Sequence, residues 1–102
     1  MSQSRARIEV PRQQIADFCR RHRVRRLALF GSVLRDDFGP DSDVDVLVEF
    51  EPDTRLGFAF FRMQDELSDL LGRRVDLRTP QGLSKYFRDE VLAEAEELYV
   101  AA

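Results

Sequence analysis

Hydrophobic and polar positions follow two different periods along this chain of 102 residues. At 43–50, "DVDVLVEF", valines recur at every second position, which is typical of a strand with one buried face. At 56–71 apolar residues recur at three- and four-residue spacing, and Gly72 follows as a helix terminator. The whole pattern predicts helices at 11–22, 32–37, 56–71 and 86–96, and strands at 24–30, 43–50 and 74–79.

The run "LYV" at 98–100 fits either a short edge strand or an overrun of the helix before it. Helices and strands that alternate in this way predict an α/β domain of two or three layers. A chain of this length suits one domain, 1–102, with a hydrophobic core of its own.

Composition narrows the classes of function. The net charge is −3, which argues against a domain that binds nucleic acid through its overall charge, and we expect no direct nucleic-acid contact. The one cysteine, Cys19, excludes an intramolecular disulfide and a cysteine zinc site, and favours a reducing, cytoplasmic setting. No apolar run approaches the length of a signal peptide or a membrane span.

Three aspartates are the candidate catalytic and metal-binding residues. Asp43 and Asp45 share one face of the predicted strand at 43–50, where two carboxylates repel each other unless a cation lies between them. Mg²⁺ typically takes one or two protein carboxylates and completes its shell with water and phosphate oxygens. Asp76, in the strand at 74–79, joins them if the two strands are neighbours. Three such acids are typical of a two-metal phosphoryl-transfer site, whereas the alternative for Asp76 is an exposed acid at a strand end.

A Gly-Ser pair, Gly31-Ser32, breaks the chain directly after the first predicted strand. Glycine lets the backbone approach a ligand closely, and free N–H groups at a helix start attract phosphate. We therefore expect a phosphate tail on Gly31 and Ser32, with Arg35 one turn further on and able to reach the same anion.

The stretch "GSVLRDDFGPDSDVDVLVEF" resembles a known signature: Gly-Ser, ten residues, Asp-x-Asp. It is the signature of the nucleotidyltransferase superfamily related to DNA polymerase β. "VDLRTP" and the tail "LSKYFRDEVLAEAEELYV" are similar to its minimal branch, the MNT-type antitoxins encoded beside a HEPN-domain ribonuclease toxin. The resemblance covers about 24–100 and implies the minimal polymerase β-like core, a small mixed β-sheet flanked by helices.

The same resemblance implies an activity: transfer of AMP from ATP to a tyrosine hydroxyl of the HEPN toxin, as the antitoxin of a type VII toxin–antitoxin pair. By position, Gly31 and Ser32 would hold the triphosphate, and Asp43 and Asp45 would bind Mg²⁺, as two ions. Asp76 would assist the attacking hydroxyl as a base or as a metal ligand. The chain departs from the family in one place, with Arg35-Asp36 where many members have Arg-Gly.

Two other classes of function remain open. The protein could be a binding antitoxin that blocks its toxin sterically and keeps a vestigial site. It could instead be a nucleic-acid regulator that acts through "RRHRVRR" at 20–26, although those arginines also suit a solvated helix end. The sequence leaves open the acceptor, the nucleotide, and whether the protein forms a homodimer or a hetero-oligomer with its toxin.

Overall fold

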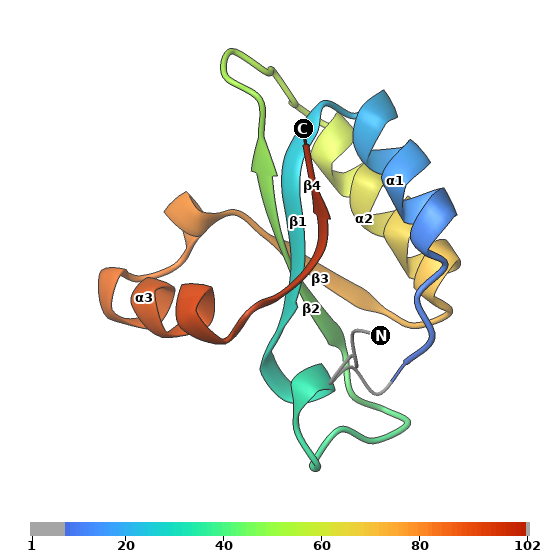
Figure 1. Ribbon diagram of the computed structural model, residues 1–102, viewed down its shortest axis with the longest axis vertical. Coiled ribbons are helices and arrows are strands. Elements are labelled where there is room, and N and C mark those ends of the chain that lie inside the picture. Colours follow the sequence, from blue (N-terminus) through green and yellow to red (C-terminus); the bar gives the residue numbers. More distant parts are fainter. Residues whose placement is uncertain (1–7, 102) are drawn as a thin grey trace.

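A four-stranded mixed sheet forms the centre of the protein in a computed structural model that describes residues 8–101 (Figure 1). The strand order is β3-β2-β1-β4; β1 runs antiparallel to β2 and β4, and β2 runs parallel to β3. The predicted mixed sheet is confirmed. Its strands are β1 (Val24–Phe30), β2 (Val44–Phe50), β3 (Val75–Arg78) and β4 (Glu96–Val100).

Helices lie on both faces of this sheet, so the domain has three layers. The helices α1 (Arg12–Arg21) and α2 (Ala59–Leu71) cover one face, and α3 (Lys85–Glu94) lies on the other (Figure 1). Two 3₁₀ turns, η1 (Gly31–Leu34) and η2 (Pro80–Gly82), complete the regular elements. None of the helices in residues 8–101 is long and apolar enough to cross a membrane.

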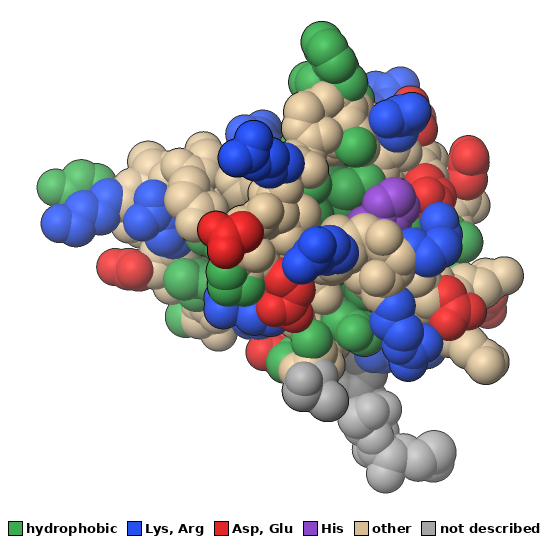
Figure 2. Space-filling model, turned by 90° about the horizontal axis from the view of Figure 1, so that it is seen from above, with side chains coloured by type: hydrophobic (Ala, Val, Ile, Leu, Met, Phe, Trp, Pro, Cys, Tyr) green, Lys and Arg blue, Asp and Glu red, His purple; other side chains and the backbone are tan. Residues whose placement is uncertain are grey.

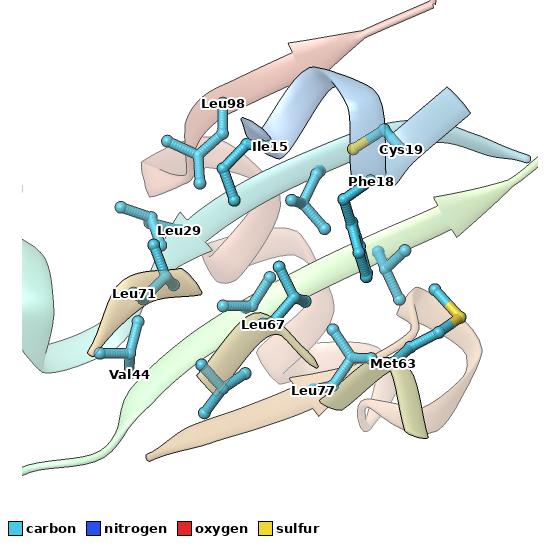
Figure 3. Packing of buried hydrophobic residues seen from close by; sticks show 14 of the residues in the cluster. Ile15, Phe18, Cys19, Leu29, Val44, Met63, Leu67, Leu71, Leu77 and Leu98 are labelled. Atoms are coloured by element: carbon cyan, nitrogen blue, oxygen red, sulfur yellow. The ribbon is translucent and has the colours of Figure 1, made fainter. Parts of the chain in front are cut away.

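The main hydrophobic core lies between the sheet and α1 and α2 (Figure 3). Phe18 and Cys19 of α1 and Met63 and Leu67 of α2 are at most 1% exposed, as their helical spacing predicts. Burial raises the pKa of the Cys19 thiol to about 12, because the apolar surroundings disfavour the thiolate. Cys19 is therefore a packing residue without nucleophilic character.

The other face of the sheet is thinly covered. Within residues 8–101, its buried apolar cluster consists of Phe30, Leu47, Leu83 and Val91. Of the α3 side chains only Val91 is buried, whereas Phe87 is 48% exposed. This face therefore leaves strand residues accessible beside a loosely packed helix.

Three predicted helices were wrong in extent. The one predicted at 56–71 begins only at Ala59. The one predicted at 32–37 is the 3₁₀ turn η1, which ends at Leu34, one residue before an extended Arg35. The one predicted at 86–96 begins at Lys85, where the Ser84 hydroxyl caps the Phe87 N–H, and ends at Glu94. The chain from Glu96 onward instead pairs with β1, so the edge-strand alternative holds for 98–100.

The strand β3 lies at an edge of the sheet, and side chains of α2 satisfy its outer backbone groups. Gln64 Oε1 accepts a hydrogen bond from the Leu77 N–H at 3.0 Å. Ser68 Oγ accepts one from the Val75 N–H, also at 3.0 Å. These bonds block further strand pairing at this edge and fix the backbone on both sides of Asp76.

Candidate active site

Phe30, Asp45 and Asp76 form a row across three neighbouring strands. Phe30 pairs with Asp45 in the antiparallel ladder, and Asp45 pairs with Asp76 in the parallel one. Residues opposite each other in a ladder project to the same face of the sheet. Val44 and Val75, one residue earlier, lie in the main core, so the two acids project toward the α3 face. The parallel pairing thus brings Asp76 beside Asp45.

The Asp45 carboxylate lies directly against the backbone of Gly31. A Cβ at Gly31 would be 2.4 Å from Asp45 Oδ2, much closer than any real contact of that kind. Gly31 also has φ +77°, in the left-handed region that side chains disfavour. The left-handed φ favours glycine at this position, and a side chain there would have to push the Asp45 carboxylate aside.

The environment disfavours the charge on Asp45. Burial raises the pKa of this carboxyl, and the negative charges of Asp76 and Asp43 raise it further, whereas Arg78 lowers it. Within residues 8–101 the carboxylate has no hydrogen bond and no ion pair. A carboxylate that is half-buried, crowded by two acids and lacking a partner is a strong ligand for an added cation.

Asp43 immediately precedes β2 and is more exposed than Asp45. Its side chain is 45% exposed, and its Oδ1 lies 3.9 Å from Nε of Arg74. Since Asp43 contributes to the raised pKa of Asp45, the two carboxylates are close enough to interact. Asp43 acts on Asp45 less than Asp76 does, and the pairing predicted from the Asp-x-Asp spacing stays a prediction.

Asp76 is engaged by Arg78, a residue that the sequence analysis missed. Nε of Arg78 donates to Oδ1 at 3.2 Å, and Nη2 donates to Oδ2 at 3.0 Å. The sequence carried a signal for this pair, because two residues apart on a strand place both side chains on one face.

Two cavities meet at Asp45. The larger cavity, of about 440 Å³, is lined by Gly31, Ser32 and Arg35 among others. The smaller, of about 230 Å³, is lined by Asp76 and Arg78 among others. Residues shared by both are Phe30, Asp45 and Phe87. The predicted nucleotide-binding residues therefore lie on one side of Asp45 and the third acid on the other.

Ser32 and Arg35 differ in whether their side chains are free to bind a phosphate. Ser32 is half-buried in the wall of the larger cavity. Nη2 of Arg35 is 3.0 Å from Oε2 of Glu94, in an exposed ion pair with α3. To bind a phosphate, the Arg35 guanidinium must therefore break its ion pair with Glu94 or bind both groups at once. The role of Arg35 in nucleotide binding stays a prediction.

The acids fit a metal site of two carboxylates better than one of three. No group of three or more His, Cys, Asp and Glu side chains in residues 8–101 is arranged to hold a metal ion. Asp45, which has no partner in residues 8–101, and Asp43, two residues before it, would supply the one or two carboxylates that Mg²⁺ usually takes from a protein.

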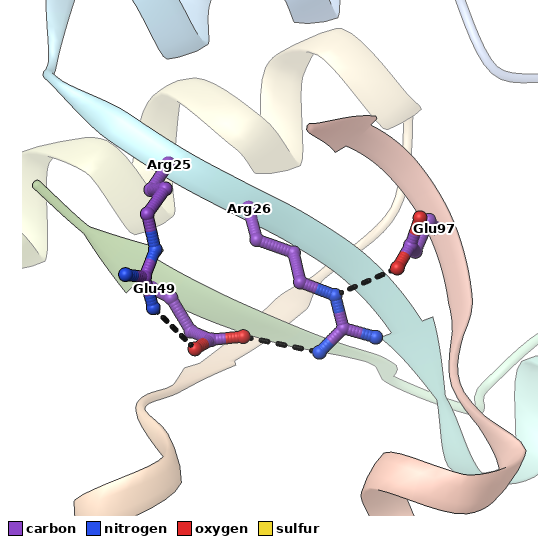
Figure 4. A network of polar contacts seen from close by, with 4 residues as sticks. All are labelled: Arg25, Arg26, Glu49 and Glu97. Carbon is purple, nitrogen blue, oxygen red and sulfur yellow. Dashed lines mark hydrogen bonds and ion pairs between the residues drawn. The ribbon is translucent and has the colours of Figure 1, made fainter. Parts of the chain in front are cut away.

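The basic segment at 20–26 is largely neutralised by acids of the protein itself. Arg25 and Arg26 both contact Glu49, and Arg26 also contacts Glu97, in a network on the exposed side of the sheet (Figure 4). On the face drawn in Figure 2, basic and acidic side chains are interspersed. The other pairs of this segment are Arg20 with Asp17, and Arg21 and His22 with Glu66. This pattern favours a solvated helix end over a nucleic-acid surface.

Comparison with known proteins places this geometry in a family. The sequence matches the nucleotidyltransferase domain over residues 11–98. The chain belongs to that family. MntA, a protein adenylyltransferase of Thermococcus cleftensis, is 41% identical over 71 residues, 70% of this chain and 71% of the relative. A Methanocaldococcus jannaschii protein provisionally named a protein adenylyltransferase is 33% identical over 84 residues, 82% of this chain and 89% of that one.

Solved structures agree with this assignment. A protein provisionally described as a minimal nucleotidyltransferase has a TM-score of 0.70 and 40% identity, over 83% of this chain and 86% of that one. A chain of a toxin–antitoxin complex with AMP-PNP gives 0.71 at 22% identity, over 90% and 75%. A chain of a complex between an MNT antitoxin and the tri-AMPylated HEPN toxin of Shewanella oneidensis gives 0.64 at 23% identity, over 88% and 70%. The protein is a nucleotidyltransferase with the minimal fold, as the resemblance in its sequence implied.

Replacing Gly31 by Ala should disable the site of this nucleotidyltransferase. Mg²⁺ with AMP-PNP should stabilise the wild type against heat, and because the new methyl group must displace the Asp45 carboxylate, the variant should not show this stabilisation. Differential scanning fluorimetry with and without the ligand measures this.

Gly72→Ala is the matched control. Gly72 also has a left-handed φ, of +66°, but nothing lies within 4 Å of the position that its new methyl group would take. Both variants incur about 1–2 kcal/mol of backbone strain, and only Gly31→Ala should lose the ligand response. Equal responses in the two variants would refute the close-contact role of Gly31.

The Asp45 charge should also make stability depend on pH. A carboxyl group whose pKa is higher in the folded than in the unfolded chain makes stability fall as pH rises through the interval between the two values. That interval begins near the unfolded value of about 4. Asp45→Asn should therefore raise the metal-free Tm at pH 7, and the gain should vanish below about pH 4. A lower Tm at pH 7 would contradict a strained charge at this position.

Proposed function

We propose that this nucleotidyltransferase transfers AMP from ATP to a tyrosine hydroxyl of a HEPN-domain toxin and thereby acts as its antitoxin in the cytoplasm. One observation carries the proposal. Asp45 has no partner in residues 8–101 and lies against Gly31. It lines both cavities: the one that is also lined by Gly31 and Ser32, and the one that is also lined by Asp76. A triphosphate and an acceptor hydroxyl can approach Asp45 from these two sides.

In this proposal the larger cavity takes the triphosphate. The bare backbone of Gly31 lets phosphate oxygens come close, and the Ser32 hydroxyl donates a hydrogen bond to them. Mg²⁺ held by Asp43 and Asp45 would neutralise phosphate charge and polarise the reacting phosphorus. Phe30 and Phe87 border both cavities and limit the access of water to the reacting groups.

Asp76 then faces the acceptor. The tyrosine oxygen attacks the α-phosphorus as Asp76 accepts the hydroxyl proton, and the bond from the α-phosphorus to the bridging oxygen breaks to release pyrophosphate. The chain does little covalent work, so the rate depends on positioning and charge, as in other phosphoryl transfers.

The choice of a HEPN toxin as acceptor rests on similarity. The AMPylated HEPN toxin bound to an MNT antitoxin is the acceptor in a structural neighbour, and MntA of T. cleftensis is named for protein adenylylation. In this chain, Phe87 of α3 lines the smaller cavity and is 48% exposed, and its sequence neighbour Tyr86 is 89% exposed. An apolar rim of this kind suits a protein acceptor.

That exposed rim also favours the second candidate, an antitoxin that neutralises the toxin by binding alone. Both candidates predict a complex, and only the enzyme needs the carboxylates. The variant Asp43→Asn with Asp45→Asn therefore separates them, because it keeps the size of both side chains and leaves α3 untouched.

With ATP, Mg²⁺ and its cognate HEPN toxin, the wild type should add AMP to a toxin tyrosine, detected by intact-mass and peptide mass spectrometry. The double variant should transfer at least about a thousandfold more slowly, since metal-assisted positioning supplies most of the rate. It should still bind the toxin.

Asp41→Asn, an exposed residue of the same loop, is the matched control and should transfer AMP like the wild type. If the double variant protects cells from the toxin as well as the wild type does, neutralisation is steric and the enzymatic proposal is wrong.

A further inference from the structure

Two carboxylates of α3 line the larger cavity. Glu90 and Glu94 lie four residues apart on this helix, and both share the cavity with Gly31 and Ser32. Glu94 pairs with Arg35, whereas the exposed side chain of Glu90 has no hydrogen bond and no ion pair within residues 8–101. The proposed function places phosphates in this cavity but leaves the wall at Glu90 without a ligand.

We propose that Glu90 binds the ribose hydroxyls of ATP and is thereby a specificity-determining residue of the site. The inference rests on the proposed function, and it deepens that function by naming the residue that recognises the nucleoside. The side chains of the proposed mechanism otherwise meet only phosphate, metal and acceptor.

The sign of the charges gives the first step. A triphosphate is strongly anionic, and like charges in one cavity repel each other unless a cation lies between them. Phosphate oxygens therefore belong beside Gly31 and Ser32, near a cation on Asp45, and away from Glu90. The nucleoside is uncharged, so it is the part of ATP that can lie against the α3 wall.

The second step is the direction of the reaction. In phosphoryl transfer the attacking and leaving oxygens lie roughly in line through the phosphorus. The proposed line runs from the smaller cavity, where the acceptor enters, to the larger one, where pyrophosphate leaves. The ester oxygen that carries the ribose must then point to the side of this line. Phe30 and Asp45 of the sheet close one side, and Phe87 of α3, which also lines both cavities, bounds another.

The spacing on α3 gives the third step. Phe87, Glu90 and Val91 line the larger cavity, and residues three and four apart share one face of a helix. Along this face from Phe87, Glu90 is the first carboxylate, and Glu94, paired with Arg35, is the second. A ribose that passes Phe87 therefore reaches a carboxylate that has no other partner in residues 8–101.

A carboxylate suits the two ribose hydroxyls. It has two acceptor oxygens, and the 2′- and 3′-hydroxyls can each donate one hydrogen bond. Hydrogen bonds to a charged acceptor are stronger than those between neutral groups. In dinucleotide-binding domains of a different fold, an Asp or Glu binds the ribose 2′-hydroxyl in this way.

Isothermal titration calorimetry with Mg²⁺ and two nucleotides, ATP and 2′,3′-dideoxy-ATP, tests the assignment. The two ligands share the base and the triphosphate and differ only in the ribose hydroxyls. The wild type should bind ATP about tenfold more tightly, which is the effect of one hydrogen bond to a charged group. In Glu90→Ala the affinity for ATP should fall about tenfold, and that for dideoxy-ATP should change by less than about twofold.

Asp89→Ala is the matched control. Asp89 precedes Glu90 on the same helix and is also exposed, but it lines neither of the two cavities. The variant removes the same charge and should keep the wild-type preference for ATP. Glu90→Gln keeps an acceptor oxygen without the charge and should retain part of the preference. Both positions are exposed and alanine is favourable in a helix, so the alanine variants should fold.

A transfer assay supplies a second readout. A contact that is equally strong in the ground state and the transition state affects KM and leaves kcat unchanged. Glu90→Ala should therefore raise the KM for ATP about tenfold in AMP transfer to the cognate HEPN toxin, with kcat within about twofold of the wild type.

Three results would overturn this inference and leave the proposed function standing. Tighter binding of both nucleotides by Glu90→Ala would show that Glu90 only repels phosphate. Equal affinity of the wild type for both nucleotides would show that no carboxylate binds the ribose. A Glu90→Ala variant that keeps its preference for ATP but binds the toxin more weakly would place Glu90 in the toxin contact.

Failure of the proposed function itself has a different sign. If Asp43→Asn with Asp45→Asn binds Mg²⁺ and ATP as the wild type does, the metal site fails, and the ribose assignment fails with it.

Discussion

The contact between the Asp45 carboxylate and the backbone of Gly31 is the constraint on which the site depends. It exists because the end of β1 turns back across the start of β2, with Phe30 opposite Asp45, at a residue that has no side chain. The contact holds a charge that the environment disfavours at the point where two cavities meet. A nucleotidyltransferase needs such a charge, because a cation and a phosphate have to be drawn to one place.

The rest of the fold is stable enough to hold the Asp45 charge in this unfavourable environment. The core beneath α1 and α2 is dense and wholly apolar, and it includes Val44 and Val46 on either side of Asp45. Since these neighbours are fully buried, the strand cannot shift to relieve the acid. The opposite face contributes only a small cluster around Val91, which leaves room for ligands beside the acids. Stability therefore comes mainly from one face of the sheet and function from the other.

Sequence reasoning recovered the fold well where the patterns were local. The strand at 24–30 and the apolar faces of α1 and α2 followed from spacing alone. The placement of Asp76 beside Asp45 depended on a parallel pairing that spacing suggests without determining. Helix α3 was predicted with bounds that were wrong at both ends, and apart from Val91 its apolar residues meet too little of the sheet to be buried. Phe87 is instead exposed at the edge of both cavities.

The polar contacts of the site were harder to predict. The Arg78–Asp76 pair could be predicted, because the Asp-x-Arg spacing in β3 places both side chains on one face. The partner of Arg35 could not be found in this way, since Glu94 lies 59 residues away and meets it only through the packing of α3. Contacts between distant exposed side chains follow from tertiary structure.

The pKa of Asp45 gives the most direct test of whether the surroundings disfavour its negative charge and a bound cation stabilises it. Carbon-detected NMR of the aspartate carboxyl groups over a pH series measures it in the metal-free protein and with saturating Mg²⁺ and AMP-PNP. Asp45 should titrate above the ordinary value of about 3.9 without metal and below it with the ligands bound. An Asp45 that titrates at the ordinary value, with no response to Mg²⁺ and nucleotide, would contradict the assignment of this site.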